Sequence, residues 1–246
     1  MVRQSYYASV SYMDAQVGRV LSALEHSSAA ESTIIVLTSD HGWSLGEHGE
    51  WEKFSNFGVS TRVPLIVKLP NGHAHAQKKK VDQLVELVDL FPSLADLAGL
   101  PVPPLCSKKK KENTCVEGLS FAPLLRSRDS VQWKTAVFSQ YPRPSVLPQM
   151  NSDQPKYRNI RIMGYSIRTN EYRYTEWIKF TPKKNKKFWQ FVNARELYAL
   201  KNDQEENENI VQLSKYATVV KSLSHSLKVG WREALPPNIT TEVQEL

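Results

Sequence analysis

Apolar side chains recur at alternating steps of four and three along residues 5–25, and polar side chains fall between them. This spacing is typical of an amphipathic helix, whose apolar positions lie on one face. The apolar face consists of Tyr6, Val10, Met13, Val17, Val20 and Leu24. We predict a helix over 5–25 that packs this face on a sheet and leads through a turn into the next strand.

Residues 34–37 form a short, continuous apolar run that is rich in β-branched side chains. Such a run favours a strand that is covered on both faces, as in a parallel sheet. Asp40 and His41 follow the run, and open α/β sheets bind ligands beyond the carboxyl ends of their strands. A carboxylate and an imidazole at this place are candidate ligands of a divalent metal. The alternative is an ordinary polar surface loop.

The loop after this strand is rich in glycine and in ionisable side chains. Its glycines allow sharp turns and a close approach of the backbone to a ligand. Lys53, at the end of the loop, is a candidate for meeting an anion as a point charge.

The rest of the pattern divides the chain into two parts. In the first part we predict a strand over 63–67, a candidate strand over 81–88, and a helix from Asp89 to Leu97 that stops at Gly99. In the second part we predict strands at 135–139 and 196–200, a β-hairpin over 165–178 and a helix over 215–231. Strands followed by a helix indicate a small antiparallel α+β subdomain. We place the division between 1–130 and 131–246.

Charge is the feature of the composition that bears on function. The 246-residue chain has a net charge of +7 and a pI of about 9.3, which favours anionic partners. Lysines gather in three runs, at 78–80, 108–111 and 183–187. We expect these runs to be solvated loop charge, with polyanion binding as the alternative. The first two runs have no aromatic residues between the lysines, which argues against nucleic acid, and no apolar stretch is long enough to span a bilayer.

The segment SDHGWSLGEHGEWEK at 39–53 closely resembles a signature of the sulfatase family. The segments FSQYPRPS at 138–145, NSDQP at 151–155 and IMGYSIRT at 162–169 resemble the same family. The resemblance covers most of the chain and is weakest around 71–80, at 107–114 and after about Gln204. It implies the C-terminal part of an alkaline-phosphatase-like α/β domain, followed by the α+β subdomain. It also implies a lysosomal hydrolase of sulfate esters on glycosaminoglycans such as heparan sulfate and dermatan sulfate.

The resemblance assigns roles to individual residues. Asp40 and His41 match positions that bind Ca²⁺, and Lys53 matches a lysine that contacts the substrate sulfate. Calcium prefers oxygen ligands, so Asp40 is the better supported of the two metal ligands. His48 has two interpretations: it holds the loop in place, or it transfers a proton or contacts substrate at acidic pH. Trp43 is expected to pack against neighbours, with a place in the sugar pocket as the alternative; Arg143 is expected to be structural or exposed.

Two features bear on the cellular compartment. Cys106 and Cys115 flank eight residues, and either redox compartment is compatible with two cysteines. The resemblance favours a disulfide between them on the secretory route, where the sequon that begins at Asn238 would carry a glycan. Against this, residues that follow Met1 do not form a signal peptide.

The family's nucleophile is missing from this sequence. Sulfatases convert the cysteine of a Cys-x-Pro-Ser-Arg segment to formylglycine, and neither Cys106 nor Cys115 lies in such a segment. The family's N-terminal pair of aspartates is also missing. We therefore expect a fragment, the C-terminal part of a sulfatase, that hydrolyses nothing alone. The alternatives are a non-catalytic protein that binds sulfated glycosaminoglycans, and a phosphate-ester hydrolase of the same superfamily; the Gly-Glu-His-Gly-x-x-x-Lys spacing argues against the latter.

Overall fold

A computed structural model describes residues 1–70, 80–107, 114–126, 131–150, 152–237 and 239. The last lysine run lies within these residues, whereas residues 108–111, most of the run at 78–80 and the sequon residue Asn238 lie outside them. Among the described residues, no helix is both long and apolar enough to cross a membrane.

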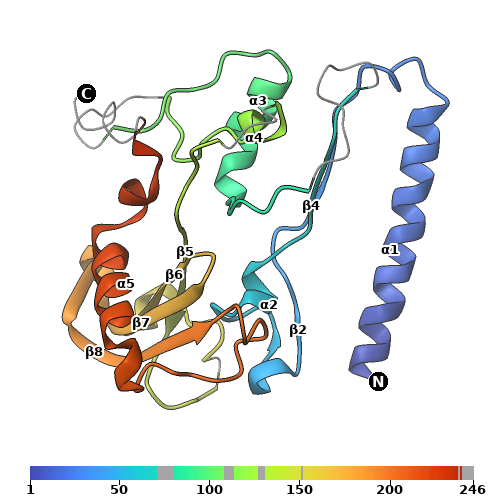
Figure 1. The fold of residues 1–246 in the computed structure, drawn as a ribbon. Helices are drawn as coiled ribbons and strands as arrows, with labels where there is room; N and C mark the ends of the chain where they lie inside the picture. Colours follow the sequence, from blue (N-terminus) through green and yellow to red (C-terminus); the bar gives the residue numbers. More distant parts are fainter. Residues whose placement is uncertain (71–79, 108–113, 127–130, 151, 238, 240–246) are drawn as a thin grey trace.

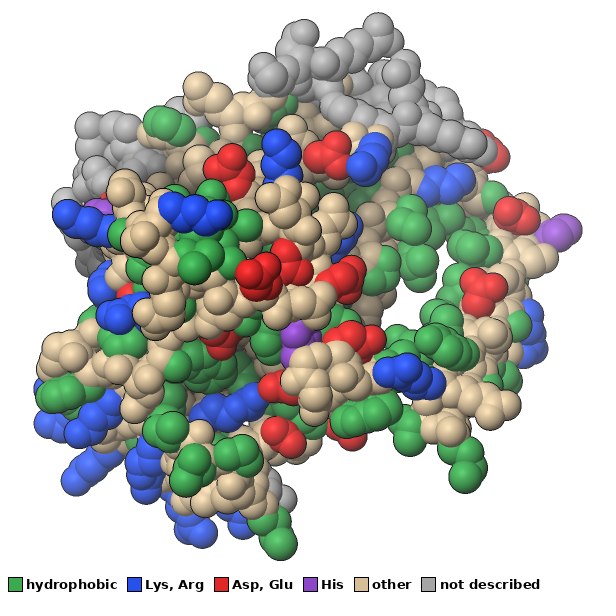
Figure 2. Space-filling view, turned by 60° about the horizontal axis from the view of Figure 1, so that its bottom comes forward, with side chains coloured by type: hydrophobic (Ala, Val, Ile, Leu, Met, Phe, Trp, Pro, Cys, Tyr) green, Lys and Arg blue, Asp and Glu red, His purple; other side chains and the backbone are tan. Residues whose placement is uncertain are grey.

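The long helix α1 (Val2–Glu25) forms as predicted but stands at one side of the molecule (Figure 1). None of its residues is buried. On the predicted apolar face, Val10, Met13 and Val20 are 41%, 49% and 69% exposed. The prediction that this face packs on a sheet is therefore wrong for this chain. Figure 2 shows an open space beside the helix, where none of the described residues forms a layer along this face.

The strand after α1 is also less covered than predicted. β1 (Ile35–Thr38) pairs antiparallel with β4 (Leu65–Lys68), so the predicted parallel sheet is not found there. Leu37 lies opposite Ile66 in this ribbon, and these side chains are 39% and 58% exposed. The other face packs on a small core of Leu69, Leu97, Phe121, Ala122 and Leu124. A two-stranded ribbon with a core on one side buries only every second side chain.

Beyond β4 the chain forms short helices around this small core. The helix predicted from Asp89 is present as α3 (Leu90–Leu97), with the 3₁₀ turn η2 (Leu87–Asp89) before it and α4 (Ala122–Arg126) farther on. The candidate strand over 81–88 is wrong. Its backbone and side chains bond elsewhere: the Leu84 carbonyl accepts from the Trp133 indole at 2.7 Å, and Glu86 accepts from Lys134 at 2.7 Å.

The second half contains the antiparallel sheet that the sequence predicts. Its strand order is β5-β6-β7-β8. The strands are β5 (Val137–Arg143), β6 (Ile162–Arg168), β7 (Tyr172–Thr181) and β8 (Lys186–Ala199). The helix α5 (Ala217–Val229) packs Leu223 and Leu227 into the core that the sheet provides, between the 3₁₀ turns η5 (Ser214–Tyr216) and η6 (Trp231–Ala234). β8 begins ten residues before the predicted strand at 196–200. The sequence did not indicate this earlier start, because lysines and aromatic residues obscure the alternation of polar and apolar side chains there.

The loop after Lys53 is fastened to this sheet. Asn56 donates to the Gly164 carbonyl at 3.0 Å, and the Gly58 backbone donates to the buried Glu206 carboxylate at 2.7 Å. Arg173, also buried, lies 3.0 Å from Glu206 and stacks its guanidinium on Phe57 at 4.6 Å. Gly164 has to be glycine, because a Cβ there would lie 2.7 Å from the Trp177 ring. These contacts join the two predicted domains, and the division near residue 130 stays a prediction.

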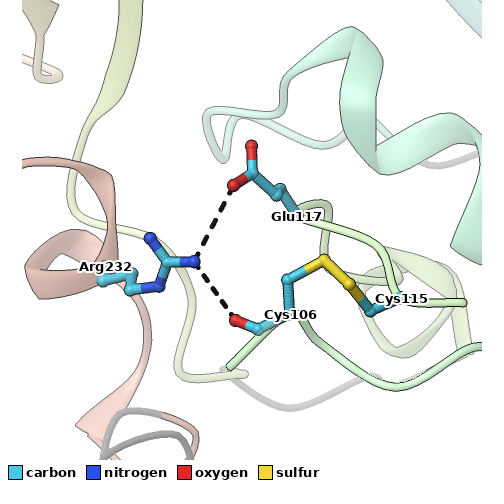
Figure 3. Close-up of a disulfide and its surroundings, with 4 residues drawn as sticks. All are labelled: Cys106, Cys115, Glu117 and Arg232. Atoms are coloured by element: carbon cyan, nitrogen blue, oxygen red, sulfur yellow. Dashed lines mark hydrogen bonds and ion pairs between the residues drawn. A yellow bond between two sulfur atoms is a disulfide. The ribbon is translucent and has the colours of Figure 1, made fainter. Parts of the chain in front are cut away.

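Cys106 and Cys115 form a disulfide, as the family resemblance implied. Figure 3 shows how η6 is attached to it. Arg232 donates a hydrogen bond to the Cys106 carbonyl at 3.2 Å and lies 3.7 Å from the Glu117 carboxylate. The disulfide segment and the end of the chain are thereby held together.

Candidate functional site

The candidate site begins where β1 ends. The Ser39 hydroxyl donates to the His41 carbonyl at 2.8 Å, and the His41 amide donates to the Asp40 carboxylate at 3.1 Å. The backbone at Gly42 passes directly against the short helix α2 (Gly58–Thr61). A Cβ at Gly42 would lie 2.0 Å from the Val59 carbonyl oxygen, so only glycine fits. These contacts hold Asp40 and His41 at the mouth of the loop.

A small hairpin returns Lys53 to the same place. β2 (Ser44–Leu45) pairs antiparallel with β3 (Trp51–Glu52), and the 3₁₀ turn η1 (Glu47–Gly49) connects them. Lys53, which follows β3 directly, places its Nζ 2.7 Å from Nε2 of His41. The structure thus brings together Asp40, His41 and Lys53, which are the residues that the sequence singled out.

Hydrogen bonds fix the orientation of the His41 ring. Nδ1 lies 2.8 Å from the Gly42 carbonyl oxygen, which can only accept, so Nδ1 carries the proton. Nε2 then offers its lone pair to the Lys53 ammonium, while the Asp40 carboxylate lies 3.4 Å from Nε2. The Asp40 side chain is 83% exposed and Lys53 is exposed, so both are free to meet a ligand from solvent.

Asp40 and His41 offer two ligand atoms, fewer than a metal site needs. Asp40 offers a carboxylate and His41 an imidazole lone pair, which Lys53 occupies in this structure. Across the described ranges, no three histidine, cysteine or acidic side chains are grouped to hold a metal ion. Calcium takes six to eight oxygen ligands. Asp40 and His41 therefore fit a divalent cation only as two of its ligands, and the described residues do not supply the rest.

His48 lies in a different environment from this cluster. It sits in η1 with a positive φ of 58°, and its ring stacks on Phe57 with a centroid separation of 3.7 Å. Phe57 in turn lies under Arg173. Next to His48, the Glu47 carboxylate accepts from the Leu45 amide at 2.5 Å, a bond that lowers the pKa of Glu47. Among the described residues, the His48 ring is held by this stacking.

Trp43 packs between α1 and the site. Its ring stacks on Tyr6 at 6.0 Å and lies 6.2 Å from the His41 ring. Arg3 adds a hydrogen bond to the Leu45 carbonyl at 2.8 Å. The first turns of α1 therefore contact the site, although most of the helix is uncovered.

The sequence did not single out the cleft beside the site. Residues 49–52 and 54 form one wall, and residues 144, 149–150, 153–156 and 158–159 form the other, around a volume of about 930 Å³. A smaller cavity of about 340 Å³ adjoins it, with Arg143 in its wall. The Arg143 guanidinium lies 3.2 Å from the Glu50 carboxylate, and its central carbon lies 4.6 Å from the centre of the Tyr141 ring. Its place in Tyr-Pro-Arg-Pro, between two prolines at a strand end, is the sequence signal for it.

Glu50 provides a test of this arrangement by pH. Burial raises the pKa of Glu50 above its usual 4.5, although Arg143 acts in the opposite direction. Below about pH 4.5 the carboxyl is protonated in both the folded and the unfolded state and contributes nothing. As the pH rises from there through the folded-state pKa, the buried charge costs stability. We expect the wild-type protein to lose stability relative to Glu50→Gln over this window.

The measurement is the free energy of unfolding of both proteins at about pH 4 and about pH 7. Glu52→Gln, in the exposed strand β3, is the matched control. A difference between Glu50→Gln and wild type that stays constant with pH, or that shifts in favour of wild type as the pH rises, would contradict the expected burial.

The chain is similar in sequence to proteins of known family. The sulfatase family model matches residues 1–100. The chain is 43% identical to iduronate 2-sulfatase of Mus musculus, over 90% of this chain and 46% of that protein. It is 45% identical to iduronate 2-sulfatase of Homo sapiens, over 85% of this chain and 44% of that protein. The chain thus spans less than half the length of these relatives.

The fold agrees with this similarity. The solved structure of a 2-O GAG sulfatase aligns over 95% of this chain and 41% of that chain, with a TM-score of 0.63 and 27% identity. The fold is that of the alkaline-phosphatase-like sulfatases, a family that generally binds a divalent metal. Fold, sequence similarity and the matched segment agree, and the chain therefore belongs to the sulfatase family.

Proposed function

We propose that this chain supplies the Asp40–Lys53 side of an active site that hydrolyses sulfate esters. The observation that carries the proposal is the cluster at the end of β1, where Lys53 lies 2.7 Å from His41 beside the Asp40 carboxylate. Identity of 43–45% to the two iduronate 2-sulfatases supports the 2-sulfate of iduronate, in heparan sulfate and dermatan sulfate, as the substrate.

In this proposal Lys53 binds the sulfate. Its ammonium group is exposed, and a sulfate oxygen would replace His41 as its hydrogen-bond acceptor. Positive charge held near the sulfuryl oxygens stabilises the negative charge that develops on them during hydrolysis. His41 is then free to offer Nε2 to a cation, with Asp40 as the oxygen ligand.

The finer assignments belong to the same proposal. The cation is Ca²⁺, which would withdraw electrons from the sulfate, and its remaining ligands come from outside the residues described here. The protein acts in the lysosome, and a glycan on Asn238 and the Cys106–Cys115 disulfide accord with a secretory route. His48 positions the loop through its stacking on Phe57.

The proposal is tested with two proteins. One is the 246-residue chain alone, and the other is a hybrid in which the N-terminal part of human iduronate 2-sulfatase precedes this chain. We expect the hybrid to release sulfate from a 2-sulfated iduronate disaccharide and the chain alone to release none, because only the hybrid carries the nucleophile. Sulfate release by the chain alone, or none by a folded hybrid that carries formylglycine, would overturn it.

A further inference from the structure

Eight positive charges gather on one surface with no acidic residue among them. Neither 154–170 nor 177–195 contains an Asp or a Glu. The cations are Lys156, Arg158, Arg161, Lys179, Lys183, Lys184, Lys186 and Lys187, and all are exposed. For comparison, the net charge of the whole chain is +7. In Figure 2, Lys and Arg side chains gather at the left and lower left, on the side that carries β8 and α5 in Figure 1.

The two segments lie side by side in the fold. The Tyr157 hydroxyl in the 3₁₀ turn η3 (Tyr157–Asn159) donates to the Pro182 carbonyl at 2.7 Å, in the turn η4 (Pro182–Lys184). The Phe180 amide donates to the Arg161 carbonyl at 2.8 Å. We call residues 156–161 and 179–187 together the basic surface. The prediction that the last lysine run lies in a loop is partly wrong, because Lys183 and Lys184 belong to η4 and Lys186 and Lys187 begin β8.

Aromatic rings hold several of these lysines in place. Lys179 lies 5.5 Å from the Phe188 ring, and Lys186 lies 4.9 Å from the same ring. Lys187 lies 4.5 Å from the Tyr165 ring. No ion pair involves the eight cations within the described part of the chain. The eight positive charges thus lie close together, several of them held by aromatic rings, and no acidic side chain among the described residues pairs with them.

The basic surface runs into the cleft beside the candidate site. Lys156 and Arg158 line that cleft on one side together with Asp153, and Glu50, Glu52 and Phe54 line it on the other. Lys53 lies within this second wall segment of the chain. The cleft therefore connects the basic surface to the chain segment that carries Lys53, and its lining includes the carboxylates of Glu50, Glu52 and Asp153.

We propose that the basic surface binds a sulfated polysaccharide and leads it into the cleft. The assignment to a sulfated polysaccharide rests on the proposed function. Charge and packing support it against nucleic acid, because single strands bind through free aromatic faces on which bases stack. Within the basic surface Tyr157, 56% exposed, is the one open ring, whereas lysine ammonium groups, which suit sulfate groups, lie over Phe188 and Tyr165. The surface is a second binding site, in addition to the Asp40–Lys53 cluster.

The test measures binding of the 246-residue chain to a size-fractionated heparin oligosaccharide over a series of salt concentrations. The variant is Lys183→Ala/Lys184→Ala/Lys186→Ala, at exposed positions in η4 and at the first residue of β8. The matched control is Lys68→Ala/Lys201→Ala/Lys215→Ala, which removes the same charge from exposed sites outside the basic surface. We expect the variant to bind about tenfold or more weakly at low salt, with a salt slope smaller by about 2–3, and the control to bind like wild type.

Each other outcome overturns the inference. Wild type that does not bind, a variant that binds normally while its thermal unfolding is unchanged, or an equal loss in the control would show that the basic surface is not the site. Equal binding of the desulfated oligosaccharide, or tighter binding of a single-stranded oligonucleotide or of phosphatidylserine vesicles, would assign it to another ligand. These readouts need no turnover, so they stand apart from sulfate release by the hybrid, which tests the proposed function.

Discussion

Replacing Lys134 by methionine is expected to destabilise the protein by about 3–5 kcal/mol, the range for breaking a buried ion pair by removing one partner. The Lys134 ammonium lies 2.7 and 2.9 Å from the two oxygens of Asp89 and 2.7 Å from Glu86. The side chains of Lys134 and Asp89 are 2% and 0% exposed. Methionine fills the space of lysine but carries no charge, so the Asp89 carboxylate would stay buried without its cation.

The contacts around the buried ion pair also explain why loss of Lys134 is expected to destabilise several parts of the fold. Asp89 accepts hydrogen bonds from the amides of Glu86 and Leu119, and the Phe138 amide donates to Glu86 at 3.0 Å. One ammonium group therefore connects α3, the segment before α4 and the first strand of the large sheet.

Urea unfolding of Lys134→Met measures the effect. Lys215→Met, at an exposed site, is the control and should change stability by less than about 0.5 kcal/mol. The double variant Lys134→Met/Asp89→Asn should recover part of the loss, because it removes the unpaired charge. A single variant that unfolds like its control would refute the role of the pair.

The second large effect is on catalysis. In the hybrid, Lys53→Ala is expected to lower kcat for sulfate release by about 10²–10³, as losing one preorganised group that stabilises transition-state charge does elsewhere. Lys53 is exposed, and its Nζ contacts His41 Nε2 at 2.7 Å, so stability should change little. Steady-state kinetics of the hybrid and its variant give the measurement.

Two controls make this result interpretable. Lys68→Ala removes a charge of the same kind from an exposed strand position and should leave kcat unchanged. Lys53→Arg keeps the charge but changes its shape and should restore part of the activity. If Lys53→Ala turned over substrate like the unaltered hybrid, Lys53 would not bind the reacting sulfate.

The sequence by itself determined the parts of this protein that depend on local pattern. The spacing along 5–25 gave α1, and the alternation around residues 170–171 gave the β6–β7 hairpin. The segment 39–53 gave the candidate residues Asp40, His41 and Lys53, because a strand end with glycines and ionisable groups is visible in the residue order alone. The resemblance carried by that segment also gave the family.

Only the tertiary structure decided which of these residues meet and what covers them. The β2–β3 hairpin places the exposed Lys53 ammonium group against His41, and the His48 ring stacks on Phe57. The apolar face of α1 was predicted to be buried, but much of it is exposed. The spacing of apolar residues shows which side of a helix is apolar, but it does not show whether another layer lies against that side. The same holds for the pairing of β1 with β4 and for the basic surface, whose segments lie about twenty residues apart. Burial, strand partners and charge clusters arise from contacts between distant segments, and these contacts depend on how the whole chain packs.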